Sequence, residues 1–543
     1  MMAKRVGRWR IRPHHTALTP SPALSTRHKA LQPVPTLQKV AIRAFSASGM
    51  DAFMEFEREM ALKRRQTQPA PSVPLEKPIP PKEDECCHLD CPNCVLLVYQ
   101  EKLLEYELSL RVKAQPAKPQ VPEPQWKIAL LDAEPNPSQI AELEANNNLL
   151  YRVARNDTVS KPHRTKDGSW RSVQHIDLHV ENEQRSNISE DASNIAVYAP
   201  NDADAVNRMI SHLQVDPDLV FTAKSLDTSP PSASQQHRPF STIGTVRDAL
   251  TWSFDLIATP RLSFLRHLAA YATEESEITA LTAPQALENI LSTRNGKPPT
   301  LVDILDMFPS IHLDFASFYQ FAPVNAPRYY TVSSSRRLFP DTVSITLGLR
   351  KTETQPIPRC SSYLTSLHPG IDSVRATFLQ SSFVFPRHDR RPLMLISAGT
   401  GIAPFRAFLQ DLEHEQELSS EQNHRVAYVF YGCRRPDIDY LYQDDLHRAQ
   451  SKGYVDQLYI EFSELPGRPK RYVQDALMEQ RELLATHLLA NDGYIFVCGS
   501  LAMGRAVKQA IVEALRPHLS ADADVQAFLK QLLARQQLVT ELW

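Results

Sequence analysis

Alternating apolar and polar residues in the middle of the chain predict short strands that a long helical stretch interrupts. A period of two is typical of strands with one buried face, whereas residues from about 204 to 320 repeat with the period of a helix. We therefore expect an antiparallel β-barrel over residues 160–388, with a helical connecting insertion at about 204–320. The predicted strands of the barrel are 172–180, 195–202, 328–335, 341–350 and 377–385.

Residues 390–543 show a different pattern, in which apolar strand-length runs alternate with amphipathic helical segments. This alternation predicts an α/β domain built on a doubly wound parallel sheet. The predicted strands are 393–397, 426–431, 457–462 and 494–498.

The first of these strands ends in Gly399-Thr400-Gly401, and Pro404 stands at the start of the following helix. Glycines allow backbone N–H groups and a helix N-terminus to approach a diphosphate closely, and proline is tolerated in a first helical turn. The turn is consistent with dinucleotide binding, although such turns also serve only to close a βα unit.

Composition describes a soluble, multidomain protein. The 543 residues are 42% hydrophobic and 22% charged with a net charge of −2, and their length predicts about two to four domains. This charge balance lacks the basic excess of a nucleic-acid-binding protein, and we expect no transmembrane segment because no uncharged apolar run is long enough.

The first 50 residues contain Lys, Arg, Ser and Thr but no Asp or Glu. This bias predicts a mitochondrial transit peptide and a matrix location, and Arg43-Ala44-Phe45-Ser46 resembles a matrix-protease cleavage site. The alternative is a disordered basic arm.

Two proline-rich linkers, residues 66–77 and 113–125, flank a cysteine-rich module at 78–112. The module resembles the oxidoreductase-like domain of small mitochondrial proteins. Thiolates this crowded repel one another unless a cation or a bond offsets their charge, so we expect a metal site. Zinc, an iron–sulfur cluster, a redox-active dithiol and an inert structural knot all stay open. The four cysteines are Cys86, Cys87, Cys91 and Cys94.

Several motifs in the right order resemble the ferredoxin–NADP reductase superfamily, and in particular the FAD/NADPH half of diflavin reductases. The resemblance runs from about Arg171 to Trp543 and implies FAD and NADPH as cofactors. The motifs are Arg328-Tyr329-Tyr330-Thr331-Val332-Ser333-Ser334, residues 431–442, Val497-Cys498-Gly499 and Glu541-Leu542-Trp543.

For FAD, the resemblance assigns Arg328 to the pyrophosphate, Tyr330 to the isoalloxazine face and Thr331 to the region of flavin N5. Arginine offers a planar, permanently charged fork to a phosphate, and residues 328 and 330 share one face of a strand. Cys360, Ser361 and Ser362 match a helix start that donates to the pyrophosphate. Pro358 replaces the glycine usual there, so one N–H is lost.

For NADPH, the resemblance assigns Gly399, Thr400, Gly401, Pro404 and Arg434 to the pyrophosphate. It assigns Ser463, Lys470 and Tyr472 to the dianionic 2′-phosphate, which requires cations and hydroxyl donors. Glu464 stands where the family has an arginine. A carboxylate repels a phosphate, so the preference for NADPH weakens unless Arg468 or Arg471 moves in. NADPH is still expected over NADH, because Lys470 and Tyr472 remain.

The resemblance places Thr331, Cys498 and Glu541 at the site of hydride transfer, with Trp543 over the isoalloxazine. Glu541 is one methylene longer than the usual aspartate. Trp543 must then leave before nicotinamide enters.

These features predict an FAD-containing, NADPH-dependent oxidoreductase that passes electrons to an external acceptor protein or quinone. The FMN domain that precedes the barrel in diflavin reductases is not expected here, because the linkers and the cysteine module occupy its place. The cysteines are a possible internal relay. The alternative is a non-catalytic mitochondrial assembly or scaffold protein with a retired reductase fold.

Overall fold

The computed structural model describes most of the chain from Trp126 onward and scattered residues before it. In this part, no helix is both long enough and apolar enough to pass through a bilayer. The described residues are 77–81, 98–99, 102–103, 106, 119–121, 123–131, 136–140, 149–165, 167–188, 192–226, 243–283, 285–293, 298–352, 357–380, 383–387, 389–418 and 425–543.

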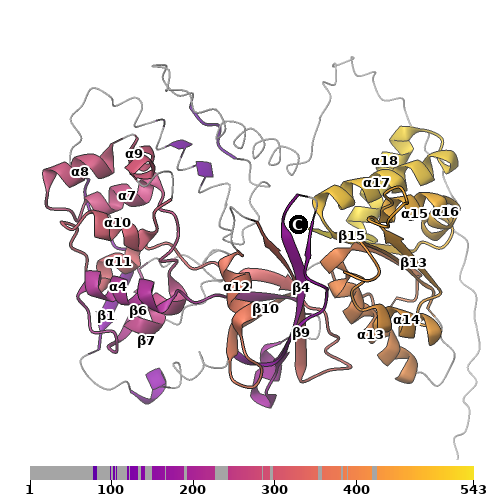
Figure 1. The fold of residues 1–543 in the computed structure, drawn as a ribbon, viewed down its shortest axis with the longest axis horizontal. Coiled ribbons are helices and arrows are strands. Elements are labelled where there is room, and N and C mark those ends of the chain that lie inside the picture. Colours follow the sequence, from indigo (N-terminus) through magenta and orange to yellow (C-terminus); the bar gives the residue numbers. More distant parts are fainter. Residues whose placement is uncertain are drawn as a thin grey trace, which may run out of the picture. The chain divides into compact units, whose positions relative to one another are not determined.

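The insertion contains a group of short helices and two strands, and these strands form a small sheet with a strand from ahead of the barrel (Figure 1). The antiparallel sheet has the order β1 (Trp126–Leu130), β6 (Val220–Ser225) and β7 (Ile243–Thr245). The helices are α4 (Ala203–Leu213), α6 (Val246–Asp248), the π-helical η3 (Ala249–Ser253), α7 (Leu262–Ala269), α8 (Glu275–Thr282), α9 (Ala286–Thr293), α10 (Leu301–Met307) and α11 (Phe315–Phe321).

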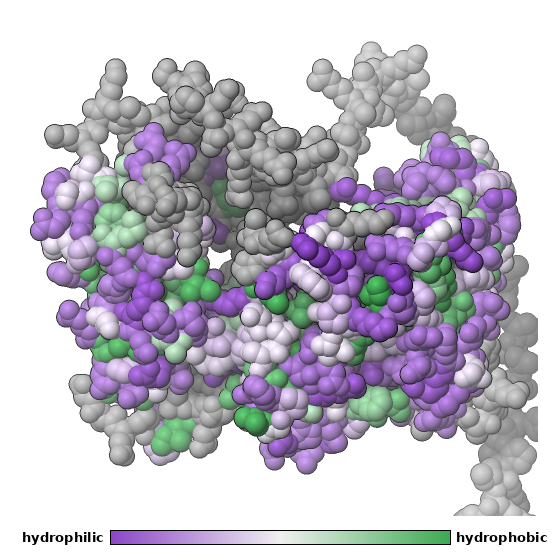
Figure 2. Space-filling view, viewed as in Figure 1, coloured by the Kyte–Doolittle hydropathy of each residue, from purple (hydrophilic) through white to green (hydrophobic). Residues whose placement is uncertain are grey.

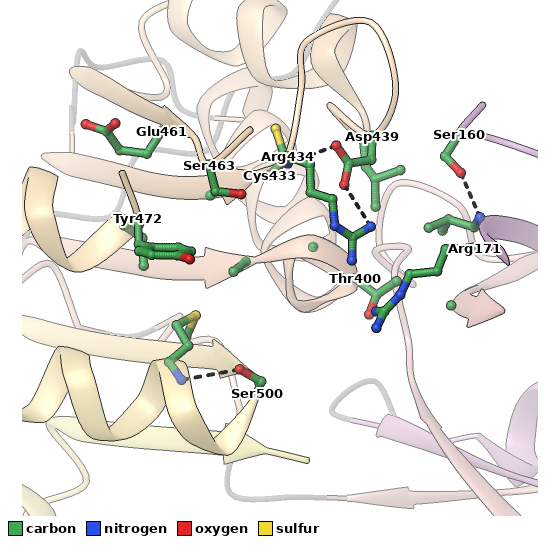
Figure 3. A pocket seen from close by; sticks show the side chains of 18 of the residues that line it. Ser160, Arg171, Thr400, Cys433, Arg434, Asp439, Glu461, Ser463, Tyr472 and Ser500 are labelled. Carbon is green, nitrogen blue, oxygen red and sulfur yellow. Dashed lines mark hydrogen bonds and ion pairs between the residues drawn. The ribbon is translucent and has the colours of Figure 1, made fainter. Parts of the chain in front are cut away.

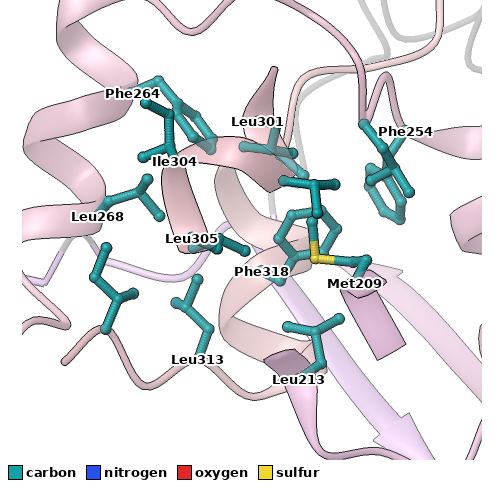
Figure 4. Packing of buried hydrophobic residues seen from close by; sticks show 14 of the residues in the cluster. Met209, Leu213, Phe254, Phe264, Leu268, Leu301, Ile304, Leu305, Leu313 and Phe318 are labelled. Atoms are coloured by element: carbon teal, nitrogen blue, oxygen red, sulfur yellow. The ribbon is translucent and has the colours of Figure 1, made fainter. Parts of the chain in front are cut away.

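The helices and the small sheet share one apolar core, in which Met209, Leu268 and Phe318 are fully buried (Figure 4). The prediction of helices throughout residues 204–320 missed β6 and β7. The signal was present in β6, because Phe221 and Ala223 are buried while their neighbours are less so, which is the period of a strand.

Seven strands and two short helices form the barrel. The sheet order is β3-β4-β2-β10-β5-β8, with β9 paired to β4 and every pairing antiparallel. A bridge between Val332 and Ile345 joins the last strand to β9 and closes the barrel, which confirms this part of the predicted fold. The elements are β2 (Leu150–Thr158), β3 (His163–Arg164), β4 (Trp170–His179), η2 (Asn182–Asn187), β5 (Ala192–Tyr198), β8 (Arg328–Thr331), β9 (Thr342–Lys351), α12 (Arg359–Ser366) and β10 (Ser373–Gln380).

Two barrel boundaries differ from the sequence pattern. Strand β2 begins at Leu150, ahead of residue 160. The segment predicted as a strand over 377–385 ends at Gln380. Phe383 and Phe385 are apolar because they are buried in the core of the next domain, where Phe383 packs against Phe405 and Phe496. Their hydrophobicity therefore belongs to a different core from that of the strand.

The C-terminal domain contains a five-stranded, all-parallel sheet in the order β13-β12-β11-β14-β15. This order, with crossover helices between strands, confirms the doubly wound fold. The elements are β11 (Leu393–Ala398), η4 (Gly399–Ile402), α13 (Ala403–Leu418), β12 (Ala427–Cys433), α14 (Gln443–Ser451), β13 (Gln457–Phe462), α15 (Val473–Glu479), α16 (Arg481–Leu489), β14 (Tyr494–Gly499), α17 (Leu501–Leu515), η5 (Arg516–His518), α18 (Asp522–Ala534) and β15 (Leu538–Leu542).

Both faces of this sheet are buried. Along β11, Leu393 and Leu395 enter the core shared with α13 and α14, while Met394 and Ile396 enter the core shared with α15, α16, α17 and α18. A strand buried on both faces is an uninterrupted apolar run, which is why these strands were recognisable in the sequence. Apolar side chains on the visible surface occur in small groups among polar ones (Figure 2), as is usual for folded proteins.

Polar contacts hold the C-terminal domain against the barrel. The Tyr442 hydroxyl bonds to His175 Nδ1 at 2.7 Å and also to Thr346 on β9. Arg406 of α13 donates to the backbone oxygen of Ser333 at 2.7 Å, and the guanidinium also lies over the Tyr442 ring. Because these partners come from both domains, they fix the distance between the residues that each domain contributes to the site.

The buried His487 predicts acid sensitivity of the C-terminal domain. Its side chain is 0% exposed, and burial lowers the pKa from the ordinary 6.5 to about 4 although the ring also hydrogen-bonds to the Tyr494 backbone oxygen. In the unfolded chain His487 therefore takes up a proton near pH 6.5, whereas in the folded protein it stays neutral down to about pH 4. The free energy of unfolding should fall by about 3 kcal/mol across this window.

Denaturant unfolding between pH 7 and pH 4 measures this loss. His487→Gln, which keeps a donor for Tyr494, should flatten the dependence, and His518→Gln at a half-exposed position should not. An equal slope in wild type and His487→Gln contradicts the assignment.

Candidate active site

Strand β8 presents the residues predicted to hold a flavin. Arg328 and Tyr330 lie two residues apart on this strand and so on the same face, and among the described residues no ion pair involves the exposed Arg328. The Tyr330 hydroxyl donates to Cys360 Sγ at 3.5 Å, which joins the strand to the start of α12. Burial raises the pKa of Tyr330, so its hydroxyl stays protonated. An uncompensated arginine beside a half-buried aromatic ring fits a diphosphate next to a flat, apolar ring system.

Helix α12 begins beside this strand with its first N–H groups available. Pro358 is the N-cap residue and its carbonyl accepts from Ser362 N at 2.8 Å, so Cys360 and Ser361 lie in the first turn, where N–H groups lack helical partners. The Arg359 guanidinium contacts Asn201, Asp255 and Asn325. Arg359 thereby ties the helix start to the insertion, and the fit to a phosphate rests on Arg328 and the α12 backbone.

The residues predicted for hydride transfer lie together where the two domains meet. Thr331 Oγ1 donates to Glu541 Oε2 at 3.1 Å, and Cys498 lies directly opposite Glu541 in the β14–β15 register. Burial raises the pKa of Glu541, and its two hydrogen bonds oppose that rise. Burial and the nearby carboxylate raise the pKa of Cys498, so the group is a neutral thiol at pH 7.

Asn194 completes this corner, and the sequence pattern did not single it out. Its Nδ2 donates to Glu541 Oε1 at 3.1 Å, and Asn194 lies opposite Thr331 in the β5–β8 register. Both oxygens of the carboxylate are therefore held by the barrel. The longer side chain of glutamate, noted as a departure from the family, reaches these two donors.

A cleft of about 710 Å³ runs between the barrel and the C-terminal domain (Figure 3). Six predicted residues line it: Gly399, Thr400, Arg434, Ser463, Tyr472 and Trp543. Gly399 has a φ of +58° and open space where a side chain would be, which suits close approach of a ligand. A Cβ on Gly401 would lie 2.1 Å from the Cys498 backbone oxygen, so this glycine allows the turn to pack on β14.

Two predicted nucleotide residues lie away from the cleft. Pro404 borders a small hollow of about 40 Å³ together with Thr331. Lys470 is exposed on the loop before α15 and is not among the residues that line the cleft.

Four arginines line the cleft, namely Arg171, Arg350, Arg434 and Arg471, and the first two were not predicted. Arg171 on β4 faces Arg350 on β9 directly in register, an arrangement that is unfavourable for like charges. Burial, then Arg434 and Arg350, lower the pKa of Arg171, and its buried Nε lacks a partner among the described residues. Arg350 is paired with Asp167 and Arg434 with Asp439, so the partnerless Nε of Arg171 is the group that fits a diphosphate best. Only strand pairing brings these residues together, so no local motif could reveal them.

The C-terminal residue Trp543 is 54% exposed and lines the cleft. Its backbone is anchored, because Trp543 N donates to Gly499 O at 3.1 Å and Trp543 O accepts from Leu501 N at 3.2 Å. The indole can therefore move by side-chain rotation while the strand end stays in place.

The predicted metal ligands Cys86, Cys87, Cys91 and Cys94 lie outside the described residues. Within the residues that are described, no group of three or more His, Cys, Asp or Glu side chains is arranged to hold a metal ion.

Comparison with protein families agrees with this geometry. Residues 142–363 match the FAD binding domain, residues 395–509 match the oxidoreductase NAD-binding domain, and residues 72–115 match the N-terminal domain of oxidoreductase-like proteins. The chain thus combines the two domains of a ferredoxin–NADP reductase-like flavoprotein, as the motifs implied. These two domains support an NAD(P)H-dependent flavoprotein oxidoreductase with FAD and NADPH as its cofactors.

The chain is similar to part of several inducible nitric oxide synthases. It is 36% identical to that of Sus scrofa over 287 residues, which are 50% of this chain and 24% of that protein. It is 32% identical to that of Homo sapiens over 301 residues, 54% of this chain and 26% of that protein. It is 33% identical to that of Oryctolagus cuniculus over 301 residues, which are 53% of this chain and 60% of that protein. The chain therefore spans about a quarter of the pig and human relatives.

Asn194→Ala is expected to slow flavin reduction by about tenfold at neutral pH. The substitution removes one hydrogen bond, and a loss of about 1.4 kcal/mol corresponds to a tenfold change in rate. The lost donor should raise the pKa of Glu541 further and move the acidic limb of the rate profile to higher pH. Asn194→Asp should move that limb further still, because two carboxylates would share one proton.

Stopped-flow reduction across pH, with the KM for NADPH, measures both effects. A fall in rate without any shift of the acidic limb means that Asn194 is only structural.

Proposed function

We propose that this protein oxidises NADPH at the cleft and delivers the electrons to a separate acceptor. The observation that carries the proposal is the corner formed by Thr331, Cys498 and Glu541. It joins β8, which carries Arg328 and Tyr330, to β15, and Trp543 directly after β15 lines the cleft. A hydride transfer requires its donor and acceptor rings to be aligned and shielded from water, and residues from both domains meet at that point.

When bound, FAD supplies an acceptor for a hydride and a donor of single electrons. The protein's part is positioning. Arg328 and the α12 N-terminus would hold the diphosphate of FAD, while Arg171, Arg350 and Arg434 would hold that of NADPH. Glu541 would keep a negative charge near the nicotinamide as that ring becomes positive, with Cys498 as a neutral neighbour. The side chain of Trp543, whose backbone is anchored, would rotate to admit the nicotinamide.

The region upstream of the FAD binding domain bears on what accepts the electrons. Upstream of the FAD binding domain, residues 72–115 match the oxidoreductase-like domain, and we assign no FMN domain to them. We therefore infer a separate one-electron acceptor protein or a quinone, in mitochondria if the basic N-terminus is a transit peptide. The cysteine module is an alternative internal relay. Retention of Arg328, Tyr330, Cys498, Glu541 and Trp543 argues against a retired, non-catalytic fold.

Purified protein should be yellow and should lose its flavin absorbance with NADPH in the absence of oxygen. Arg328→Ala should weaken FAD binding by about 10- to 100-fold, the value of a charge-assisted contact to phosphate. The control is Arg155→Ala, since Arg155 is an exposed barrel arginine paired with Asp157.

Absorbance titration with FAD and anaerobic reduction give both results. Protein that binds no FAD, or that stays oxidised with NADPH and NADH alike, contradicts the proposed function. Iron, sulfide and zinc analysis of the same sample tests the relay.

A further inference from the structure

Arg471 lies at one end of the cleft between two carboxylates. Its Nε and Nη2 donate to Glu461 at 3.0 and 2.8 Å, and its Nη1 contacts Glu479 at 2.8 Å. Glu461 comes from β13, whereas Glu479 ends α15, so the arginine bridges a strand and a helix. Arg471 and Glu461 both line the cleft, together with Ser463 and Tyr472 (Figure 3 shows the last three).

The other charges near this end do not favour a phosphate. Glu464 occupies the position expected for arginine, and its Oε1 lies 3.9 Å from Arg434 Nε. Arg434 also contacts His163 at 3.0 Å and Asp439 at 3.7 Å, so its charge is already shared. Lys470 and Arg468 are exposed and do not line the cleft. Of the cations close to Ser463 in sequence that the structure describes, Arg471 is the one at the cleft surface.

Unlike Arg471, Glu461 favours a ribose that carries no phosphate. Its side chain is only 15% exposed, and a carboxylate in a cleft accepts a hydrogen bond from a ribose hydroxyl but repels a phosphate. The pair therefore offers one group for each form of the nucleotide. Arginine has five N–H donors. Three of its nitrogens use one donor each on the two glutamates, which leaves two donors for a phosphate.

We propose that the Arg471–Glu461 pair sets the choice between NADPH and NADH, with Arg471 as the contact of the 2′-phosphate and Glu461 as the contact of the unmodified ribose hydroxyl. The inference rests on the proposed function, because it concerns the nucleotide that the same cleft binds. Since Glu461 and Glu479 neutralise Arg471 before the nucleotide arrives, preference for NADPH is smaller than an uncompensated cation would give, and NADH is also a substrate.

Two substitutions should move the preference in opposite directions. Arg471→Ala removes the phosphate contact and should lower kcat/KM for NADPH by about 10- to 30-fold while changing that for NADH less than twofold. Glu461→Gln keeps a hydrogen-bond acceptor for Arg471 but removes the repelling charge, so it should raise kcat/KM for NADPH several-fold and lower that for NADH. Loss of folding cannot produce both results.

Arg481→Ala is the matched control, because Arg481 is an exposed arginine on the neighbouring α16. Equal losses with both nucleotides in Arg471→Ala, or no change in the NADPH/NADH ratio in either variant, would overturn the assignment.

Binding of 2′,5′-ADP and of 5′-AMP separates this proposal from the proposed function, because neither probe can donate a hydride. Arg471→Ala should weaken 2′,5′-ADP about tenfold and leave 5′-AMP unchanged. A protein that shows this binding difference but is not reduced by either nucleotide supports the specificity site and rejects the reductase. A reducible protein in which Arg471→Ala binds both probes as wild type does rejects the specificity site alone.

Discussion

The barrel holds the carboxylate of Glu541 through hydrogen bonds from Thr331 and Asn194, and the geometry of the site depends on this contact. Glu541 belongs to the last strand of the other domain, so the contact fixes the strand end that carries Trp543. Both donors are side chains of directly paired barrel residues. The hydrogen bonds therefore fix the position of β15 relative to β8, the strand that carries Arg328 and Tyr330. The chemistry that we propose needs such a fixed relation, since hydride transfer is sensitive to small changes in alignment.

Electrostatics divide the cleft into two regions. Arg171, Arg350 and Arg434 line the cleft together with the glycine turn, whereas Arg471 and its partner Glu461 bring both signs of charge to the other end. The first region is suited to a group that every nicotinamide dinucleotide carries, the diphosphate. The second is suited to the group that distinguishes NADPH from NADH. Affinity and selectivity therefore come from separate residues.

Much of the fold could be predicted because its strands have clear patterns. The parallel strands are apolar on both faces, and the barrel strands alternate, so both domains were recognisable. Phe383 and Phe385 led to a predicted strand that is too long at its end, since a local pattern does not show which core a phenylalanine enters. Motifs located Arg328, Thr331, Cys498 and Glu541. Asn194, Arg171 and Arg350 could not be found this way, because strand pairing across distant segments gives them their neighbours.

The most direct test of the account is the primary kinetic isotope effect on flavin reduction. Anaerobic stopped-flow absorbance would follow the bleaching of the bound flavin with NADPH and with NADPH that carries deuterium at the transferred position of the nicotinamide. We expect rapid bleaching that deuterium slows, because the hydride passes directly between the aligned rings. Flavin that stays oxidised when mixed with NADPH would contradict it.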